Sequence, residues 1–258
     1  IAIVVVLVLA IIFMIRSHRN QEQVLEEQIA FEKSIEQGAL DQAKVIAICA
    51  DNMNYILSNL HDVLEEALDG LQHENLKKLS KAFKKFSEIE KKAHKLKDAA
   101  RKALEQINDD DMESAHMFIL VVDYLTEMTG HVEGIIEPCL NHVDNNHKPL
   151  MKEQIEELKK INEALKYILQ GTIKVFNTLD AGDAESEMAK SDPFVKLVRG
   201  IRKNQLKRVK NGEVGTKNSI LYLHLLGEFR NLGLFSNRLV QVCHDLIINP
   251  EVDSEKEI

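Results

Sequence analysis

The sequence predicts an all-α protein, and three observations support this prediction. The 258 residues include only 4 prolines and 11 glycines, so few residues interrupt helices. Apolar residues recur at helical spacing over long stretches, and no stretch alternates apolar and polar residues as a strand does. Hydrophobic residues make up 45% of the chain, which is enough to bury a sizeable core.

The chain begins with an uncharged apolar segment, residues 1–15. As a helix this segment spans about 22 Å, short of the ~30 Å hydrocarbon core of a bilayer. A signal peptide would carry basic residues before its apolar stretch, but here Arg16 and Arg19 follow it. We interpret 1–16 as the end of a transmembrane helix in the cell (inner) membrane, with the following residues in the cytoplasm. A buried helix of a soluble protein is the alternative.

Three helices are expected next. A charged juxtamembrane helix is predicted over 17–37, and Gly38 ends it because glycine suits the residue after a helix. The helix predicted over 40–68 is amphipathic, and Gly70 is expected to end it. A helix rich in lysine, with apolar residues at helical spacing, is predicted over 75–107.

The middle of the chain is predicted to hold two long helices. Asp110 and Asp111 can cap the helix predicted over 112–143, because aspartate accepts hydrogen bonds from the free N–H groups at a helix start. Pro149 suits the first turn of the helix predicted over 150–179, since proline lacks an N–H that would be unpaired there.

A loop is expected over 180–193, and Pro193 opens the helix predicted over 194–210. The last long helix is predicted over 216–246, and a charged tail follows over 248–258. The soluble part therefore holds six helices, mostly joined by short loops, which favour antiparallel neighbours in bundles.

A faint internal repeat indicates how these helices group. Aligning Glu127 with Glu228 pairs Asp123 with His224, an offset of one three-helix unit. The repeat favours two stacked three-helix bundles, with chance similarity as the alternative. The expected bundles cover 38–147 and 148–247.

Composition excludes several classes of protein. Lys plus Arg is 33 against 41 Asp plus Glu, a net charge of -8, which disfavours binding to nucleic acid. The 3 cysteines are far apart and form no C-x-x-C pair, so we expect reduced core residues rather than a zinc site or disulfides. No Ser/His/Asp set, glycine-rich phosphate loop or H-E-x-x-H motif occurs in the sequence, so we expect no enzyme.

Polar residues on predicted helix faces form a candidate metal site. Asp123, Glu127 and His131 are spaced by four residues and climb one side of a helix. Glu228 falls in an apolar stripe, one turn after His224, and a buried carboxylate needs a partner. Carboxylates and imidazoles so placed can bind a divalent or ferric ion. Ion pairs with lysine and buried hydrogen-bonded histidines are the alternative.

The helix predicted over 194–210 is basic and amphipathic. Such a helix can contact anionic lipid or an acidic partner. The alternative is a solvated face balanced by acidic helices of the same domain. Its basic residues are Lys196, Arg199, Arg202, Lys203, Lys207, Arg208 and Lys210.

Two short motifs resemble a known family. Residues 224–228 read H-L-L-G-E and resemble the acidic motif of the PhoU-like phosphate-uptake regulators, typified by E-R-I-G-D-H-A. Residues 123–127 are the counterpart in the first half of the chain. The resemblance extends over about 40–246, and the stretches 123–150 and 210–240 are similar to the cytoplasmic C-terminal extension of bacterial inorganic phosphate transporters.

The resemblance implies two three-helix bundles that bind multinuclear metal clusters through such motifs. It also implies a cytoplasmic domain that modulates phosphate uptake, with the membrane part of its own transporter chain and the membrane surface as partners. A homodimer is an open alternative. The second helix of each bundle departs from the family, because lysine-rich sequence replaces the acidic motif and removes metal ligands.

Two other functions remain open. A membrane-anchored signalling or scaffold protein would form a long helical rod, and the lysine- and glutamate-rich helices favour it. A helical-bundle metalloenzyme would use the candidate metal ligands for catalysis.

Overall fold

The computed structural model describes residues 42–105 and 112–248. These residues form helices and turns, and no strand occurs in the two described ranges. The all-α prediction is therefore confirmed for this part of the chain. The helices are α2 (Gln42–Gln72), α3 (Leu76–Leu104), α4 (Met112–Asp144), α5 (Lys152–Thr178), α6 (Ala181–Met188), α7 (Ser191–Lys210) and α8 (Thr216–Ile248).

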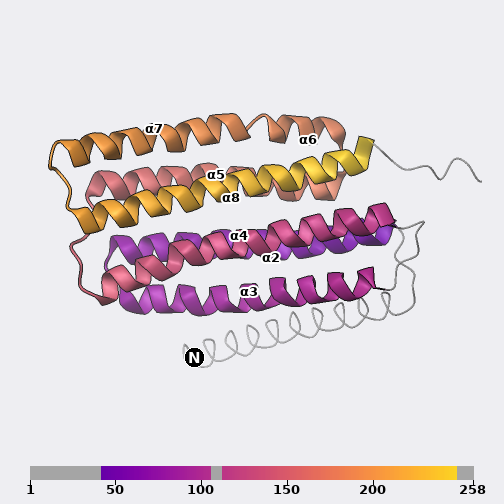
Figure 1. The fold of residues 1–258 in the computed structure, drawn as a ribbon, viewed down its shortest axis with the longest axis horizontal. Helices are drawn as coiled ribbons and strands as arrows, with labels where there is room; N and C mark the ends of the chain where they lie inside the picture. The colour runs from indigo at the N-terminus through magenta and orange to yellow at the C-terminus, as the bar shows by residue number, and fades with distance from the viewer. Residues whose placement is uncertain (1–41, 106–111, 249–258) are drawn as a thin grey trace, which may run out of the picture.

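The helices form two groups that lie side by side (Figure 1). In the first group α2, α3 and α4 all pack against one another, and in the second α5 and α8 pack with α6 and α7. In the second group α6 and α7 follow each other along one edge, so together they take the place of a single long helix (Figure 1). Each group is therefore a three-helix bundle. The bundles join where α4 packs on α8 and α2 packs on α5.

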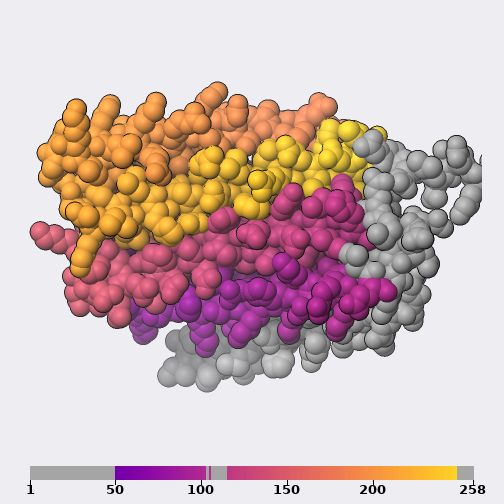
Figure 2. Space-filling model, viewed as in Figure 1, coloured from indigo at the N-terminus to yellow at the C-terminus, as the bar shows by residue number. Residues whose placement is uncertain are grey.

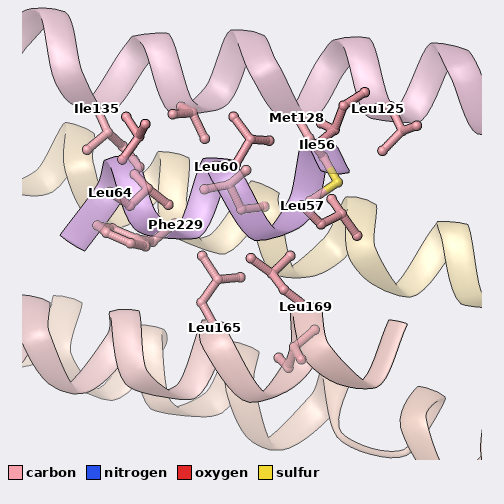
Figure 3. Packing of buried hydrophobic residues seen from close by; sticks show 14 of the residues in the cluster. Ile56, Leu57, Leu60, Leu64, Leu125, Met128, Ile135, Leu165, Leu169 and Phe229 are labelled. Carbon is pink, nitrogen blue, oxygen red and sulfur yellow. The ribbon is translucent and has the colours of Figure 1, made fainter. Parts of the chain in front are cut away.

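One continuous cluster of buried apolar side chains runs through both bundles. Each helix contributes residues three or four apart, as the spacing in the sequence requires. In Figure 2 the side chains of α4 and α8 meet across the visible face, so the two bundles pack directly on each other. Figure 3 shows part of the shared core, including Leu60 and Leu64 of α2, Met128 of α4, Leu165 of α5 and Phe229 of α8.

The expectation that Gly70 ends a helix is wrong, because α2 continues to Gln72. A Cβ atom on Gly70 would lie 2.8 Å from the Cγ atom of Leu79 in α3. Glycine at this position therefore allows α2 and α3 to approach closely beside the turn that joins them.

The expectation of a loop over 180–193 is also wrong, because this region holds α6 and the start of α7. The backbone N–H of Asp183 donates to the Oδ1 atom of Asp180 at 2.7 Å, so Asp180 is the N-cap of α6. Pro193 lies inside the first turn of α7, where its missing N–H removes no helical hydrogen bond.

The predicted transmembrane segment over 1–16, the juxtamembrane helix over 17–37 and nearly all of the expected tail lie outside the described residues. Within 42–105 and 112–248, none of the helices has the length and apolar character needed to cross a membrane. Cys139 and Cys243 are free and buried, as expected for reduced core residues. Burial raises the pKa of both thiols to about 12.

Gly171→Ala is expected to destabilise the second bundle. A Cβ atom on Gly171 of α5 would lie 1.9 Å from the Oε2 atom of Glu187, which is buried in α6. The overpacking should lower the free energy of unfolding by about 1–3 kcal/mol, measured by urea denaturation. Gly200→Ala on α7 is the control, because a Cβ atom there meets no atom within 4 Å. Equal losses in both variants would contradict this account.

Candidate functional site

Polar side chains of α4 and α8 meet at the seam between the two bundles. The Nδ1 atom of His131 donates to the Oε2 atom of Glu228 at 2.7 Å. The two side chains are 19% and 18% exposed, so water reaches them only in part. Because a partly buried carboxylate needs a partner, this hydrogen bond satisfies Glu228 and links the bundles.

His224 makes a second polar link across the same seam. Its Nε2 atom donates to the backbone carbonyl of Gly134 at 2.8 Å. Its Nδ1 atom lies 3.7 Å from the Oε1 atom of Glu228, too far for a hydrogen bond. A Cβ atom on Gly134 would lie 3.2 Å from the Cδ atom of Glu228, so glycine gives this carboxylate the room it needs.

An aromatic group borders the His131–Glu228 pair. The ring of Phe235 lies 5.2 Å from the ring of His131 and 5.8 Å from the ring of Tyr124. The guanidinium carbon of Arg238 lies 4.6 Å from the centre of the Phe235 ring. These contacts join α4 to α8 and hold the imidazole of His131 in place.

The structure does not bring all five predicted metal ligands together. The carboxylate of Asp123 lies 3.0 Å from the Nζ atom of Lys97, within the first bundle. The side chain of Glu127 is exposed. Only His131, His224 and Glu228 of the predicted set meet at the seam.

The residues at the seam do not fit a multinuclear metal cluster. Such a cluster needs several carboxylates, and this group supplies one carboxylate and two imidazoles. The Nε2 atom of His224 already donates to the backbone carbonyl of Gly134, and His131 already donates to the carboxylate of Glu228. A single ion would have to displace the hydrogen bond between His131 and Glu228, so metal binding here stays a prediction.

Sequence reasoning did not single out His61, Asp62 and Glu65 of α2, whose ligand atoms lie within 4.8 Å of one another. The only signal in the sequence is the H-D-x-x-E spacing. Asp62 and Glu65 are exposed, and acidic side chains on a helix surface often lie this close without an ion. The proximity therefore does not establish a site.

Six of the seven basic residues predicted to contact lipid or an acidic partner are exposed on α7. The helix buries Phe194, Val198, Ile201 and Gln205 against the bundle, so the opposite side faces solvent. None of the six forms an ion pair with a residue in the described ranges. They are Lys196, Arg199, Arg202, Lys203, Lys207 and Lys210.

Arg208 departs from this expectation, because its side chain points into the fold. Its two guanidinium nitrogens each donate to Glu157 of α5 at 2.8 Å. The hydroxyl of Tyr222 in α8 donates to the same carboxylate at 2.5 Å. Arg208 follows Gln205 by three residues, so it continues the inner stripe of α7 rather than the outer face.

The charge of Glu157 is stabilised by these partners. Burial by itself would raise the pKa of this carboxyl, but the hydrogen bonds from Arg208 and Tyr222 outweigh it and lower the pKa below its ordinary value. Burial and the neighbouring carboxylate raise the pKa of the Tyr222 hydroxyl well above its usual range. The network therefore binds α5, α7 and α8 together as an ionised pair with a neutral tyrosine.

This arrangement of helices is similar to that of a solved structure. The crystal structure of the phosphate transport system regulatory protein PhoU from Streptococcus pneumoniae is similar, with a TM-score of 0.66. The match covers 83% of this chain and 100% of that chain, at 15% sequence identity. The fold is PhoU-like. No family model and no curated protein matches the chain, so the likeness is one of structure rather than of sequence.

The PhoU-like helical fold expected from the motifs is therefore confirmed. Glu228 of the motif at 224–228 bonds to His131 at the seam of this fold, whereas Asp123 and Glu127 of the motif at 123–127 do not join them. The long-rod geometry of the signalling hypothesis is wrong for the described residues, since their helices fold back into two packed bundles.

Glu228→Ala is expected to lower the free energy of unfolding by about 1–3 kcal/mol, because it leaves the imidazole N–H of His131 without its acceptor. Urea denaturation of Glu228→Ala, His131→Ala and the double variant measures the coupling between the two residues. The double variant should lose less than the sum of the single losses, by roughly 0.5–3 kcal/mol. Glu127→Ala, an exposed residue on α4, is the control and should have little effect. Strictly additive losses would mean that the two side chains do not interact.

The stabilising effect of Glu157 is expected to depend on pH. Because its pKa is lower in the folded state than its ordinary value of 4.5, the carboxylate stabilises the fold above that pH. This contribution is lost as the pH falls below 4.5 and towards the folded-state pKa. Thermal unfolding of the wild type and Glu157→Gln between neutral and acidic pH should show a Tm difference that shrinks on acidification. Glu163→Gln, exposed on the same helix, is the control. A difference that grows at low pH would refute the assignment.

Proposed function

We propose that this chain is a cytoplasmic PhoU-like domain that regulates the uptake of inorganic phosphate by a membrane transporter. The observation that carries the proposal is the likeness of the two joined bundles to the whole of PhoU, a phosphate transport system regulatory protein. The acidic motifs at 123–127 and 224–228 add support from the sequence.

The chemistry of the described side chains suits regulation better than catalysis. The carboxylates that lie nearest to histidine or arginine, Glu228 and Glu157, bond to those residues and hold helices together. A regulatory domain acts through its surfaces and through the relative positions of its parts. In this proposal, the membrane part that carries out transport belongs to the same protein.

The polar links at the seam are contacts that a regulatory change in the positions of the two bundles would alter. A regulator needs two arrangements whose balance a signal can shift. His131 and His224 each make a single hydrogen bond from one bundle to the other, beside the apolar core. A change in the angle between the bundles would exchange these few polar bonds for bonds to water.

Deletion of residues 21–258 from the encoding gene tests the proposed function. Cells that lack other phosphate transporters would express the complete and the shortened protein at matched membrane levels. The rate of labelled phosphate uptake is then measured after growth in high and in low phosphate. We expect the deletion to change the uptake rate or to abolish its response to phosphate supply.

His131→Ala with Glu228→Ala, in the full-length protein, is a second variant for the same assay, and Glu127→Ala is its matched control. Uptake that is unchanged by the deletion, in both rate and response, would reject a regulatory role. If the gene encodes no transporter, a membrane-anchored signalling or scaffold protein becomes the leading hypothesis.

A further inference from the structure

We propose that the second bundle docks on an anionic lipid surface through the end of the bundle where α7 is connected to α8. This region, named here the α7–α8 tip, combines exposed apolar and exposed basic side chains. The proposal goes beyond the proposed function and does not depend on it. The tip consists of Leu206, Val209 and Ile220 together with Lys203, Lys207, Lys210 and Lys217.

The apolar residues of the tip lie close to one another on paired helices. The amide of Gln205 in α7 donates to the hydroxyl of Ser219 in α8 at 3.3 Å, which sets the register of the two helices. The next residue on each helix, Leu206 and Ile220, is therefore at the same level. These side chains are 52% and 65% exposed, and Val209, one turn along α7, is 44% exposed.

Exposure of this kind is uncommon elsewhere in the described part of the chain. Large apolar side chains that are exposed there occur mostly one at a time, on different helices. The tip gathers three of them within one turn of the α7–α8 connection, next to lysines. A group of exposed apolar residues ringed by polar residues is typical of a surface that contacts a partner or a membrane.

The positive charge of α7 is not neutralised within the described fold. On α3, the other lysine-rich helix, Lys78, Lys81 and Lys85 form ion pairs with Asp69 and Glu66 of α2. The outward-facing cations of α7 form no such pair within the described ranges. Glu157 bonds to Arg208 on the inner side of α7, and Glu228 bonds to His131 at the seam.

This combination favours lipid over an acidic protein. Lysines attract the headgroups of anionic lipids, and each contributes roughly a kcal/mol near such a surface. Aliphatic side chains between them can enter the boundary between headgroups and acyl chains, where no preformed groove is needed. Because α7 runs along the outer edge of the molecule, its whole basic side can lie against a flat surface (Figures 1 and 2). Glu213 is the one acidic side chain between Lys203 and Ile220, and the Nδ2 atom of Asn211 donates to it.

Binding of the purified full-length chain to vesicles tests the proposal. Vesicles of phosphatidylcholine are compared with vesicles that also contain phosphatidylglycerol, by co-sedimentation at several salt concentrations. The apolar N-terminal segment is the same in every variant, so the gain due to phosphatidylglycerol is the quantity of interest. We expect a clear gain that falls as salt rises, because salt screens the lysines.

Two sets of variants locate the binding surface. The triple substitution Lys203→Gln, Lys207→Gln, Lys210→Gln should lower the gain roughly a hundredfold. The matched control is Lys84→Gln, Lys91→Gln, Lys95→Gln, three exposed lysines of α3 that remove the same charge from the other bundle. Leu206→Ser with Ile220→Ser, which leaves the charge unchanged, should also lower the gain. Thermal unfolding of each variant checks that the fold is retained.

Each outcome bears on the proposal. A loss confined to the tip variants supports it. An equal loss of the phosphatidylglycerol gain in the α3 control would overturn it in favour of general electrostatic attraction. No gain with phosphatidylglycerol would overturn it because the chain would then have no contact with anionic lipid. Binding to polyglutamate that the tip lysines control, without any gain on anionic vesicles, would overturn it in favour of an acidic protein partner. Failure of the phosphate-uptake experiment leaves this test unaffected, because it measures lipid binding alone.

Discussion

The packing of α4 on α8 is the contact on which the rest of the structure depends. Each three-helix bundle leaves apolar side chains on the side that faces the other bundle, and Leu64, Leu165 and Phe229 lie together in the core that the two bundles share (Figure 3). Gly134 makes the close approach possible, since a larger residue would press against Glu228. The hydrophobic effect thus joins two bundles whose helices come from separate halves of the chain.

Polar contacts within this apolar framework determine which helices align. The bond between His131 and Glu228 and the network of Glu157, Arg208 and Tyr222 are partly buried, where an unpaired charge would be costly. Each group has its partner at only one relative position of the helices, so these contacts favour one register over others. The same bonds occupy carboxylates that could otherwise bind metal ions or act in catalysis.

The two edges of the molecule differ in how their positive charge is balanced. Four lysines of α3 pair with carboxylates of α2 and α4, whereas the outer lysines of α7 form no ion pair with a described residue. The four are Lys78, Lys81, Lys85 and Lys97. A surface of this kind at a membrane would place the second bundle beside the lipid and the first bundle further away. The proposed regulation of a membrane transporter and the proposed lipid contact are therefore compatible, although they rest on different residues.

The sequence by itself determined the long helices, because apolar spacing and few breakers act over a few neighbouring residues, but it did not predict α6, which begins after Asp180. It also identified Glu228 as a carboxylate on an apolar stripe that requires a partner. Only the tertiary structure decided which partner each side chain has. His131 bonds to Glu228, which lies 97 residues later in the chain, and Glu157 bonds to Arg208, 51 residues later. Asp123 forms an ion pair with Lys97 and does not join the other predicted metal ligands. The physical reason is that spacing along one helix shows which way a side chain points, whereas its partner depends on the helix that packs opposite.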